Sequence, residues 1–258
     1  MNTSFNIATT GIRSYQGKLD TIANNIANVD KTGFKRREAT FSENLAVSIQ
    51  NQSKPGRELG RTSPNGIRTT YGSRIGSTAL DITQGGSNQT DNPYDLMLIG
   101  NGYFQVLRTT GDNQEIHYTK NGSFHSTPVG TDRFQLVNDH GDVLLDRNGN
   151  PIESPIAGSF QVSENGTIAS TGQQIGIVTI SNPQLLKEEG GVYRLQGGAA
   201  TTMNQNFQIK QGYIETSNVQ LNKEMTEMIK AQRGLQASSR ALSYADQMMG
   251  IANSIIRS

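Results

Sequence analysis

Apolar residues recur at every seventh position near the amino end of the chain. Spacings of seven and of three or four residues place such positions on one face of a helix. Asn2 or Thr3 can cap the start of this helix, and Gly33 suits the left-handed position where a helix stops. Within residues 1–33 the pattern predicts a helix of ~40 Å, from just after the cap to just before Gly33, at 1.5 Å per residue. Its two apolar lines are Phe5, Ile12, Leu19 and Ile26, and Ala8, Tyr15, Ile22 and Val29.

The carboxyl end repeats this pattern over a longer stretch. Residues 217–220 fit a capping box, so we expect a helix that runs from there to Arg257 and measures roughly 55–60 Å. A neighbouring line of small residues allows close approach of another helix. The apolar line is Leu221, Met228, Leu235, Leu242, Met249 and Ile256, and the small line is Ala231, Ser238, Ala245 and Ala252.

Short alternating segments and Asn-Gly pairs fill the middle of the chain. Asn-Gly favours tight hairpin turns, so residues 160–163 and 167–169 are predicted to be the two arms of a hairpin, and residues 175–180 another strand. Residues 50–74 and 81–92 are rich in turn-forming residues and are interpreted as connections. The Asn-Gly pairs stand at 65–66, 101–102, 121–122, 148–149 and 165–166.

The predicted fold class is α+β, with long terminal helices that form a coiled-coil-like core region and flank a mostly β middle domain. The expected divisions are an N-terminal helix over 1–33, a linker or extended segment over 34–74, a β-rich middle domain over 75–205, and a C-terminal helix region over 206–258.

Composition narrows the possible functions. Only 33% of residues are hydrophobic and the mean hydropathy is −0.53, so much of the surface faces solvent or partners. A net charge of +1 indicates no steering toward nucleic acid, and the lack of cysteine removes disulfide and thiolate chemistry. The amino end lacks the features of a cleaved secretory signal, so a location outside the cell would require another export route.

Two apolar helices on a polar chain favour assembly. The helices can pair within one chain, and this alternative stays open. A helix pair with little further core, however, buries little area against the cost of ordering the chain, and neighbouring subunits can supply that area. Head-to-tail contacts that do not close produce an open helical filament.

The segment from Leu19 to Lys35 resembles the amino-terminal signature of flagellar rod and hook proteins. Residues 211–219, followed by 224–225 and 228–233, resemble the carboxyl-terminal signature of the same family, and residues 95–106 and 118–124 resemble its middle segments. Gly234 and Leu235 stand where the family usually has an aromatic residue. The signature residues are Asn24, Asn25, Ala27, Asn28, Gly33, Phe34, Ser217, Asn218, Gln232 and Arg233.

The resemblance implies a structural subunit without catalytic residues, cofactor or metal. It implies export through the flagellar type III apparatus, assembly as a helical homo-oligomer beside neighbouring rod and hook proteins, and a place in the basal body outside the cytoplasmic membrane. Basal-body ring proteins are a further partner that the sequence leaves open. Length and the 211–219 segment favour the distal rod class over the proximal rod and hook classes, which stay as alternatives.

The resemblance places the assembly interface on the helical lines. The residues expected there are Phe5, Ile12, Leu19, Ile22, Ile26, Val29, Leu221, Met228, Leu235, Leu242, Met249 and Ile256. Met225, Met228, Met248 and Met249 lie at helical spacing and fit both simple packing and an adaptable binding surface.

Two other motifs favour structural interpretations over chemical ones. Asp146–Asn150 begins like a calcium loop, but Pro151 and Ala157 break the pattern, which favours a hairpin turn. A basic cluster at Lys31 and residues 35–37 is interpreted as complementing a helix carboxyl end.

The histidines and the carboxylates of the middle region do not form the pattern of an enzyme site. The histidines lack the spacing of a metal site, and on a two-residue hairpin at 121–122 His125 would oppose Tyr118. A glycan-active enzyme is the alternative from another class, although the available carboxylates are spread over separate loops. The histidines are His117, His125 and His140, and the carboxylates are Asp91, Asp95, Glu153 and Glu164.

Overall fold

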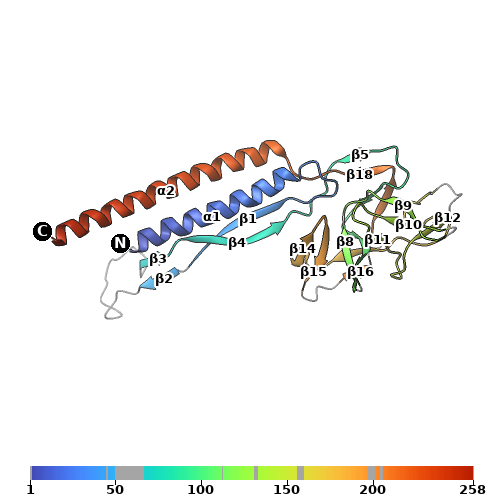
Figure 1. The fold of residues 1–258 in the computed structure, drawn as a ribbon, viewed down its shortest axis with the longest axis horizontal. Helices are drawn as coiled ribbons and strands as arrows, with labels where there is room; N and C mark the ends of the chain where they lie inside the picture. Colours follow the sequence, from blue (N-terminus) through green and yellow to red (C-terminus); the bar gives the residue numbers. More distant parts are fainter. Residues whose placement is uncertain are drawn as a thin grey trace, which may run out of the picture. The chain divides into compact units, whose positions relative to one another are not determined.

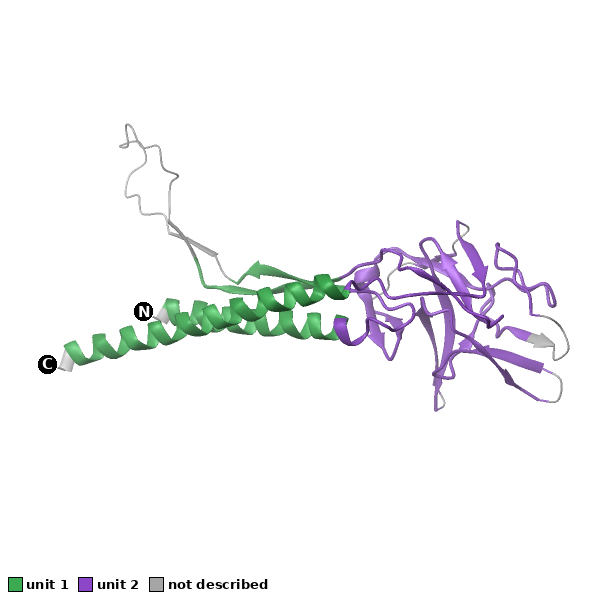
Figure 2. Cartoon of the chain, turned by 90° about the horizontal axis from the view of Figure 1, so that it is seen from above, with its two compact units in different colours: residues 1–25, 37–79, 221–258 green, residues 26–36, 80–220 purple. Residues whose placement is uncertain are grey.

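The computed structural model divides the chain into two compact units, shown in Figure 2. Unit 1 comprises residues 1–25, 37–79 and 221–258, and unit 2 comprises residues 26–36 and 80–220. The described residues are 2–44, 46–49, 67–111, 113–130, 133–155, 160–196, 201–203 and 206–257.

Unit 1 is built on two long helices, α1 (Asn2–Ala27) and α2 (Leu221–Arg257). They lie side by side in Figure 1 and run antiparallel, because Tyr15 contacts Gly234 whereas Lys18 pairs with Glu227. Both predicted helices are therefore confirmed. No helix among the described residues is long and apolar enough to cross a bilayer.

Both helices are shorter than expected at one end. α1 stops at Ala27, and residues 28–33 form turns. Gly33 does adopt a left-handed φ of 67°, but its N–H donates to Glu215 O at 2.8 Å and so belongs to a contact with the β region. α2 begins at Leu221, and the Ser217 hydroxyl accepts from Val219 N at 3.2 Å instead of capping the helix.

The segment expected as a linker contains paired strands. β1 (Arg37–Glu43) pairs with β4 (Ser73–Leu80), and β2 (Ala46–Ile49) pairs with β3 (Ile67–Thr70). The β1–β4 ribbon lies along α1: the Ser14 hydroxyl donates to Ser73 O at 2.8 Å, and Ile75 is so close to Gly17 that a β-carbon there would lie 2.3 Å from it. Gly17 therefore weakens the isolated helix but makes room for the ribbon.

Unit 2 is mostly β, as predicted. Its main sheet has ten antiparallel strands, with β12-β10-β11-β7-β8-β15-β14 as the central path, β13 and β16 joined through β7, and β9 joined to β10. The strands are β7 (Tyr103–Thr110), β8 (Asn113–Thr119), β9 (His125–Pro128), β10 (Arg133–Val137), β11 (Val143–Leu144), β12 (Glu153–Pro155), β13 (Ile177–Ile180), β14 (Leu186–Glu189), β15 (Val192–Leu195) and β16 (Thr201–Met203). A short 3-10 helix, η1 (Pro183–Leu185), precedes β14.

Alternation along the strands builds a core on each face of this sheet. Phe104 and Ile177 belong to the larger apolar cluster, whereas their neighbours Tyr103 and Val178 belong to the smaller one. Successive side chains of a strand point to opposite faces, which explains the division.

Two further strand pairs bring the chain back before α2. β6 (Leu96–Ile99) pairs with β17 (Gln208–Gln211), and β5 (Ser87–Gln89) pairs with β18 (Tyr213–Glu215). Gly212 joins β17 to β18 with a φ of 74° and donates to Asp95 O. This return places Glu215 inside unit 2.

Only some of the Asn-Gly pairs form the hairpin turns that the sequence predicted. The turns at 148–149 and 165–166 are hairpins, since Leu145 pairs with Pro151 and Val162 with Ile168. The predicted hairpin at 121–122 is wrong: β8 pairs with β7 and β15, and His125 on β9 lies opposite Val137, not Tyr118. Gly122 packs instead on Leu96, whose N–H donates to Gly122 O. Asn101-Gly102 joins β6 to β7, which do not pair, and residues 65–66 lie outside the described part.

Candidate assembly surface

The two helices of unit 1 contact each other through small and polar residues. Glu224, Ala231 and Ala245 are buried at sevenfold spacing on α2, and Ser238, half-buried, continues the line against Gly11 of α1. Lys18 and Glu227 form a 3.0 Å ion pair at the edge. The small line of α2 therefore packs inside unit 1, as its composition suggested, and larger side chains are left outside.

Asn25 joins three parts of unit 1. Its amide nitrogen donates to Glu224 Oε2 at 3.1 Å and to Arg37 O at 2.8 Å, and its oxygen accepts from Arg37 N at 3.0 Å. Asn25 and Glu224 are fully buried. This signature residue thus ties α1 to the start of β1 and to the first turn of α2.

Large apolar side chains of unit 1 face outward. Of the fifteen large hydrophobic residues that are exposed in the described part, ten belong to unit 1, although unit 1 is the smaller unit. Seven lie on α2 in two stripes at helical spacing. The first stripe is Leu221, Met225 and Ile229, and the terminal stripe is Tyr244, Met248, Ile251 and Ile255; Phe5, Ile7 and Phe41 complete the ten.

The expected interface residues are spread between the inside and the outside of the chain. Ile22 is buried, and Phe5 and Leu221 are exposed. Ile12, Leu19, Ile26, Val29, Met228, Leu235, Leu242 and Met249 are half-buried, while the side chain of Ile256 lies outside the described part. Their role in assembly stays a prediction. Of the two exposed stripes, Leu221 was among the expected interface residues, and Met225 and Met248 were considered as a binding surface. The other members were not singled out, although their spacing of three or four residues could have indicated them.

A buried ionic cluster lies in unit 2 where the signature segments meet. Lys35 Nζ is 2.5 Å from Glu215 Oε1 and donates to Thr83 O at 2.7 Å; both side chains are about 1% exposed. Lys120 Nζ lies 3.7 Å from Glu215 Oε2 and donates to Gly100 O. Lys35 therefore neutralises a buried carboxylate, and our interpretation of it as a helix-end cation was wrong.

This cluster perturbs its titratable neighbours. Burial, with a smaller contribution from the Glu215 carboxylate, raises the pKa of Tyr103 to about 12. Burial lowers the pKa of Lys120, against the opposing effect of Glu215. Both directions reflect removal from water of the charged form.

Two more signature residues hold backbone in unit 2. Asn218 Oδ1 accepts from Arg36 N at 2.7 Å, and its nitrogen donates to Asp81 O and Thr83 O at 3.0 Å. A β-carbon at Gly33 would lie 2.5 Å from Asn121 N, so only glycine fits there. Phe34 is buried, Asn28 and Ser217 are half-buried, and Asn24, Ala27, Gln232 and Arg233 are exposed.

The histidines and the Asp146 turn have structural roles. His117 is a buried residue of β8 opposite Val106, His125 lies on β9, and His140 follows Asn138 in a turn. Asp146 Oδ1 accepts from Asn148 N and Asn150 N at 2.8 Å each, which confirms the hairpin interpretation. Among the described residues, no three His, Asp or Glu side chains are grouped so that they could hold a metal ion.

The carboxylates considered for hydrolysis lie apart along the chain. Asp95 is buried and accepts from Thr90 and Asn92, and Glu153 pairs with Arg133 at 3.1 Å. Asp91 and Glu164 are exposed in separate loops.

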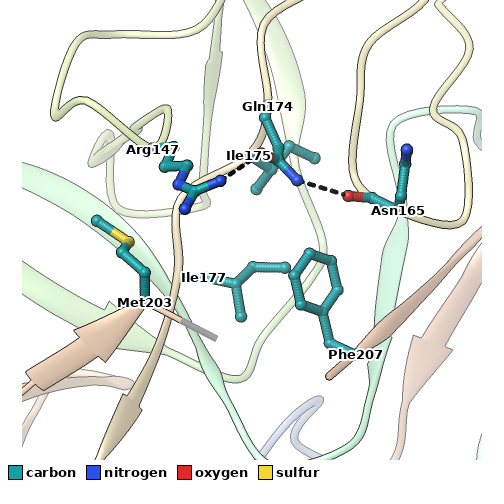
Figure 3. A pocket seen from close by; sticks show the side chains of 7 residues that line it. All are labelled: Arg147, Asn165, Gln174, Ile175, Ile177, Met203 and Phe207. Carbon is teal, nitrogen blue, oxygen red and sulfur yellow. Dashed lines mark hydrogen bonds between the residues drawn. The ribbon is translucent and has the colours of Figure 1, made fainter. Parts of the chain in front are cut away.

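A cavity of about 340 Å³ in unit 2 also lacks catalytic side chains (Figure 3). Its polar groups bind one another: Arg147 donates to Gln174 Oε1 at 3.3 Å, and Gln174 donates to Asn165 O at 3.1 Å. Ile175, Ile177, Met203 and Phe207 make the rest of the lining.

Comparison with known proteins agrees with the signatures. Three family models match: "Flagella basal body rod protein" over residues 5–35, "Flagellar hook protein FlgE/F/G D1 domain" over 97–170, and "Flagellar basal body rod FlgEFG protein C-terminal" over 210–255.

Curated relatives match over nearly the whole chain. The flagellar basal-body rod protein FlgG of Bacillus subtilis is 35% identical, with 93% of each chain covered. The flagellar hook-basal body complex protein FlhP of Bacillus subtilis is 32% identical, with 96% of this chain and 97% of the relative covered. FlgG of Borreliella burgdorferi is 31% identical, with 97% of each covered. This chain therefore belongs to the flagellar basal-body rod protein family and is a structural subunit of the rod, not an enzyme.

Proposed function

We propose that the chain occupies the distal rod and that its copies polymerise there through the apolar surface of unit 1. The observation that carries the proposal is the arrangement of side chains on the helix pair. Small and polar residues join α1 to α2, while large apolar residues face outward. Exposed apolar surface that is gathered in one region is typical of a protein interaction site.

The proposal also covers the export route of the subunit and the proteins that it contacts. The subunit leaves the cell through the flagellar type III apparatus and stacks on copies of itself and on neighbouring rod and hook proteins, outside the cytoplasmic membrane. Similarity to FlgG proteins from several bacteria supports the distal position. Similarity to a hook-basal body complex protein keeps another axial position as the alternative.

Charged substitutions in the exposed surface test the assembly mechanism. Ile229→Asp changes a side chain that is 53% exposed, so the subunit should fold, whereas burying the new carboxylate between subunits costs several kcal/mol. Leu242→Asp places the same charge on the predicted apolar line. Both variants should lose swimming and lack rods in electron micrographs.

Leu185→Asp is the matched control, because Leu185 is exposed in unit 2. It should leave swimming near normal. Normal rods from a folded, exported Ile229→Asp subunit would refute assembly through this surface. The axial position needs a density map of isolated basal bodies, in which a subunit located only in the proximal rod would overturn the distal assignment.

A further inference from the structure

A groove in unit 1 remains open in the single chain. Its volume is about 740 Å³, within the roughly 300–1,000 Å³ of typical binding pockets. α1 contributes Ile7 and Tyr15, β1 contributes Phe41, and α2 contributes Ala241, Ala245 and Met248. Ile7 and Phe41 are 42% and 43% exposed, so the groove offers apolar surface that nothing in the described chain covers.

The end of α2 extends past its helical partner. Gly11 lies at Ser238 and Tyr15 at Gly234, so in this antiparallel register Asn2 falls level with about residue 247. Figure 1 shows the carboxyl end of α2 beyond the amino end of α1. About ten residues, ~15 Å of helix, therefore extend beyond the level of the first residue of α1.

This overhang is apolar and uncharged. No charged residue occurs from Gln247 to Ile256. Ile251 and Ile255 are 61% and 68% exposed, and their spacing of four residues places them on one side of the helix. A helix with one apolar face is what an apolar groove binds.

We infer that the overhang of one copy docks in the groove of the next copy. The overhang cannot reach the groove of its own chain, because the groove already runs along residues 238–248 of the same continuous helix. A contact between two different surfaces of identical chains is heterologous and propagates from copy to copy. The inference rests on the proposed polymerisation and adds which surfaces meet.

Cysteine cross-linking tests the pairing, because the chain has no cysteine of its own. Basal bodies from cells that express Phe41→Cys/Ile251→Cys, oxidised in place, should give a ladder of disulfide-linked multimers that reductant dissolves. Either single variant should give no ladder. Ile7→Cys/Ile251→Cys repeats the test at an exposed groove residue of α1. Ile116→Cys/Ile251→Cys, with the exposed Ile116 in unit 2, is the control and should give none.

Three results would overturn the inference. Rods that form without a ladder in both groove variants would show that other surfaces meet. If a thiol reagent failed to label the free monomer of the single variant Ile7→Cys, the chain would be covering the groove itself, because Ile7 is 42% exposed. Cross-linking of either groove variant to a different protein would identify another occupant.

Swimming assays separate this inference from the proposed function. Ile251→Asp should abolish rods, as Ile229→Asp should. Rods formed by Ile251→Asp but not by Ile229→Asp would refute only the docking of the overhang, whereas rods formed by both would refute assembly through the apolar surface of unit 1.

Discussion

The backbone of Gly234 lies directly against the ring of Tyr15, so that a β-carbon at residue 234 would be 2.4 Å from two ring atoms. Glycine in a helix interior costs about 0.5–1 kcal/mol relative to alanine. The chain accepts that cost because α1 and α2 approach closely at this point. The contact explains why glycine suits residue 234.

Gly234→Ala should therefore destabilise unit 1, since the added methyl group must displace the Tyr15 ring or separate the helices. We expect a loss of about 1–3 kcal/mol, typical of overpacking, measured by urea unfolding. Gly250→Ala is the matched control: a β-carbon there meets nothing within 4 Å, so the helix should gain up to about 1 kcal/mol. Equal effects of the two changes would contradict the close contact.

Among the described residues, Lys35 and Lys120 form ion pairs with one carboxylate only, that of Glu215. Glu215→Gln should cost about 3–5 kcal/mol, because it leaves two buried ammonium groups without their partner. Glu153→Gln breaks the exposed pair with Arg133 and should change stability by at most about 1 kcal/mol. Similar losses in the two variants, measured by urea unfolding, would show that burial of the cluster does not matter.

Periodicity predicted the parts of the fold that depend on local pattern. The helices, the strand at 175–180 and the hairpins at 148–149 and 165–166 follow from spacing and turn chemistry. The turn at 121–122 fails because tertiary packing of Gly122 on Leu96 outweighs the turn preference of Asn-Gly.

The assembly surface of unit 1 was predicted only in part, because it too depends on tertiary packing. Sevenfold spacing identifies two lines on α2 but does not say which faces inward. The small line packs on α1 because Gly11 and Gly234 allow close approach. Lys35 and Glu215 are 180 positions apart in the sequence, and only the return of β17 and β18 brings them together.

Glu227 gives the helix pair a dependence on pH. Lys230 and, to a lesser extent, Lys18 lower the pKa of Glu227 from 4.5 to about 2. A carboxyl whose pKa is lower in the folded state stabilises the fold above the unfolded pKa and loses that contribution as the pH falls through the folded pKa. The contribution should be complete above about pH 4.5 and disappear toward pH 2.

The difference in unfolding free energy between wild type and Glu227→Gln should be at most about 1 kcal/mol at neutral pH, because the pair is partly exposed. It should shrink from pH 4.5 to pH 2 and at high salt. A difference that stays constant across this range would mean that the ion pairs do not form in solution.

Unit 2 should fold without the helices, but its carboxyl boundary must include β17. Ile209 is 2% exposed in the larger core and lies opposite Leu98 of β6. Gln211 donates to Pro93 O and Phe160 O at 2.7 Å and accepts from Val162 N, so it holds three segments together. A fragment that ends before β17 exposes Leu98 and leaves these backbone groups without the glutamine.

We therefore predict that residues 80–220 give β circular dichroism and a cooperative thermal transition. That fragment lacks Lys35, so Glu215 keeps the hydrogen bond from Gly85 N and has only Lys120, at 3.7 Å, as an ion-pair partner. The stability of the fragment should therefore be lower than that of unit 2 in the whole chain. Residues 75–205, the middle domain expected from sequence, should melt at a markedly lower temperature or not fold, because the fragment cannot bury Leu98 against Ile209. Equal melting temperatures for the two fragments would show that the core closes without β17 and would support a domain boundary near residue 205.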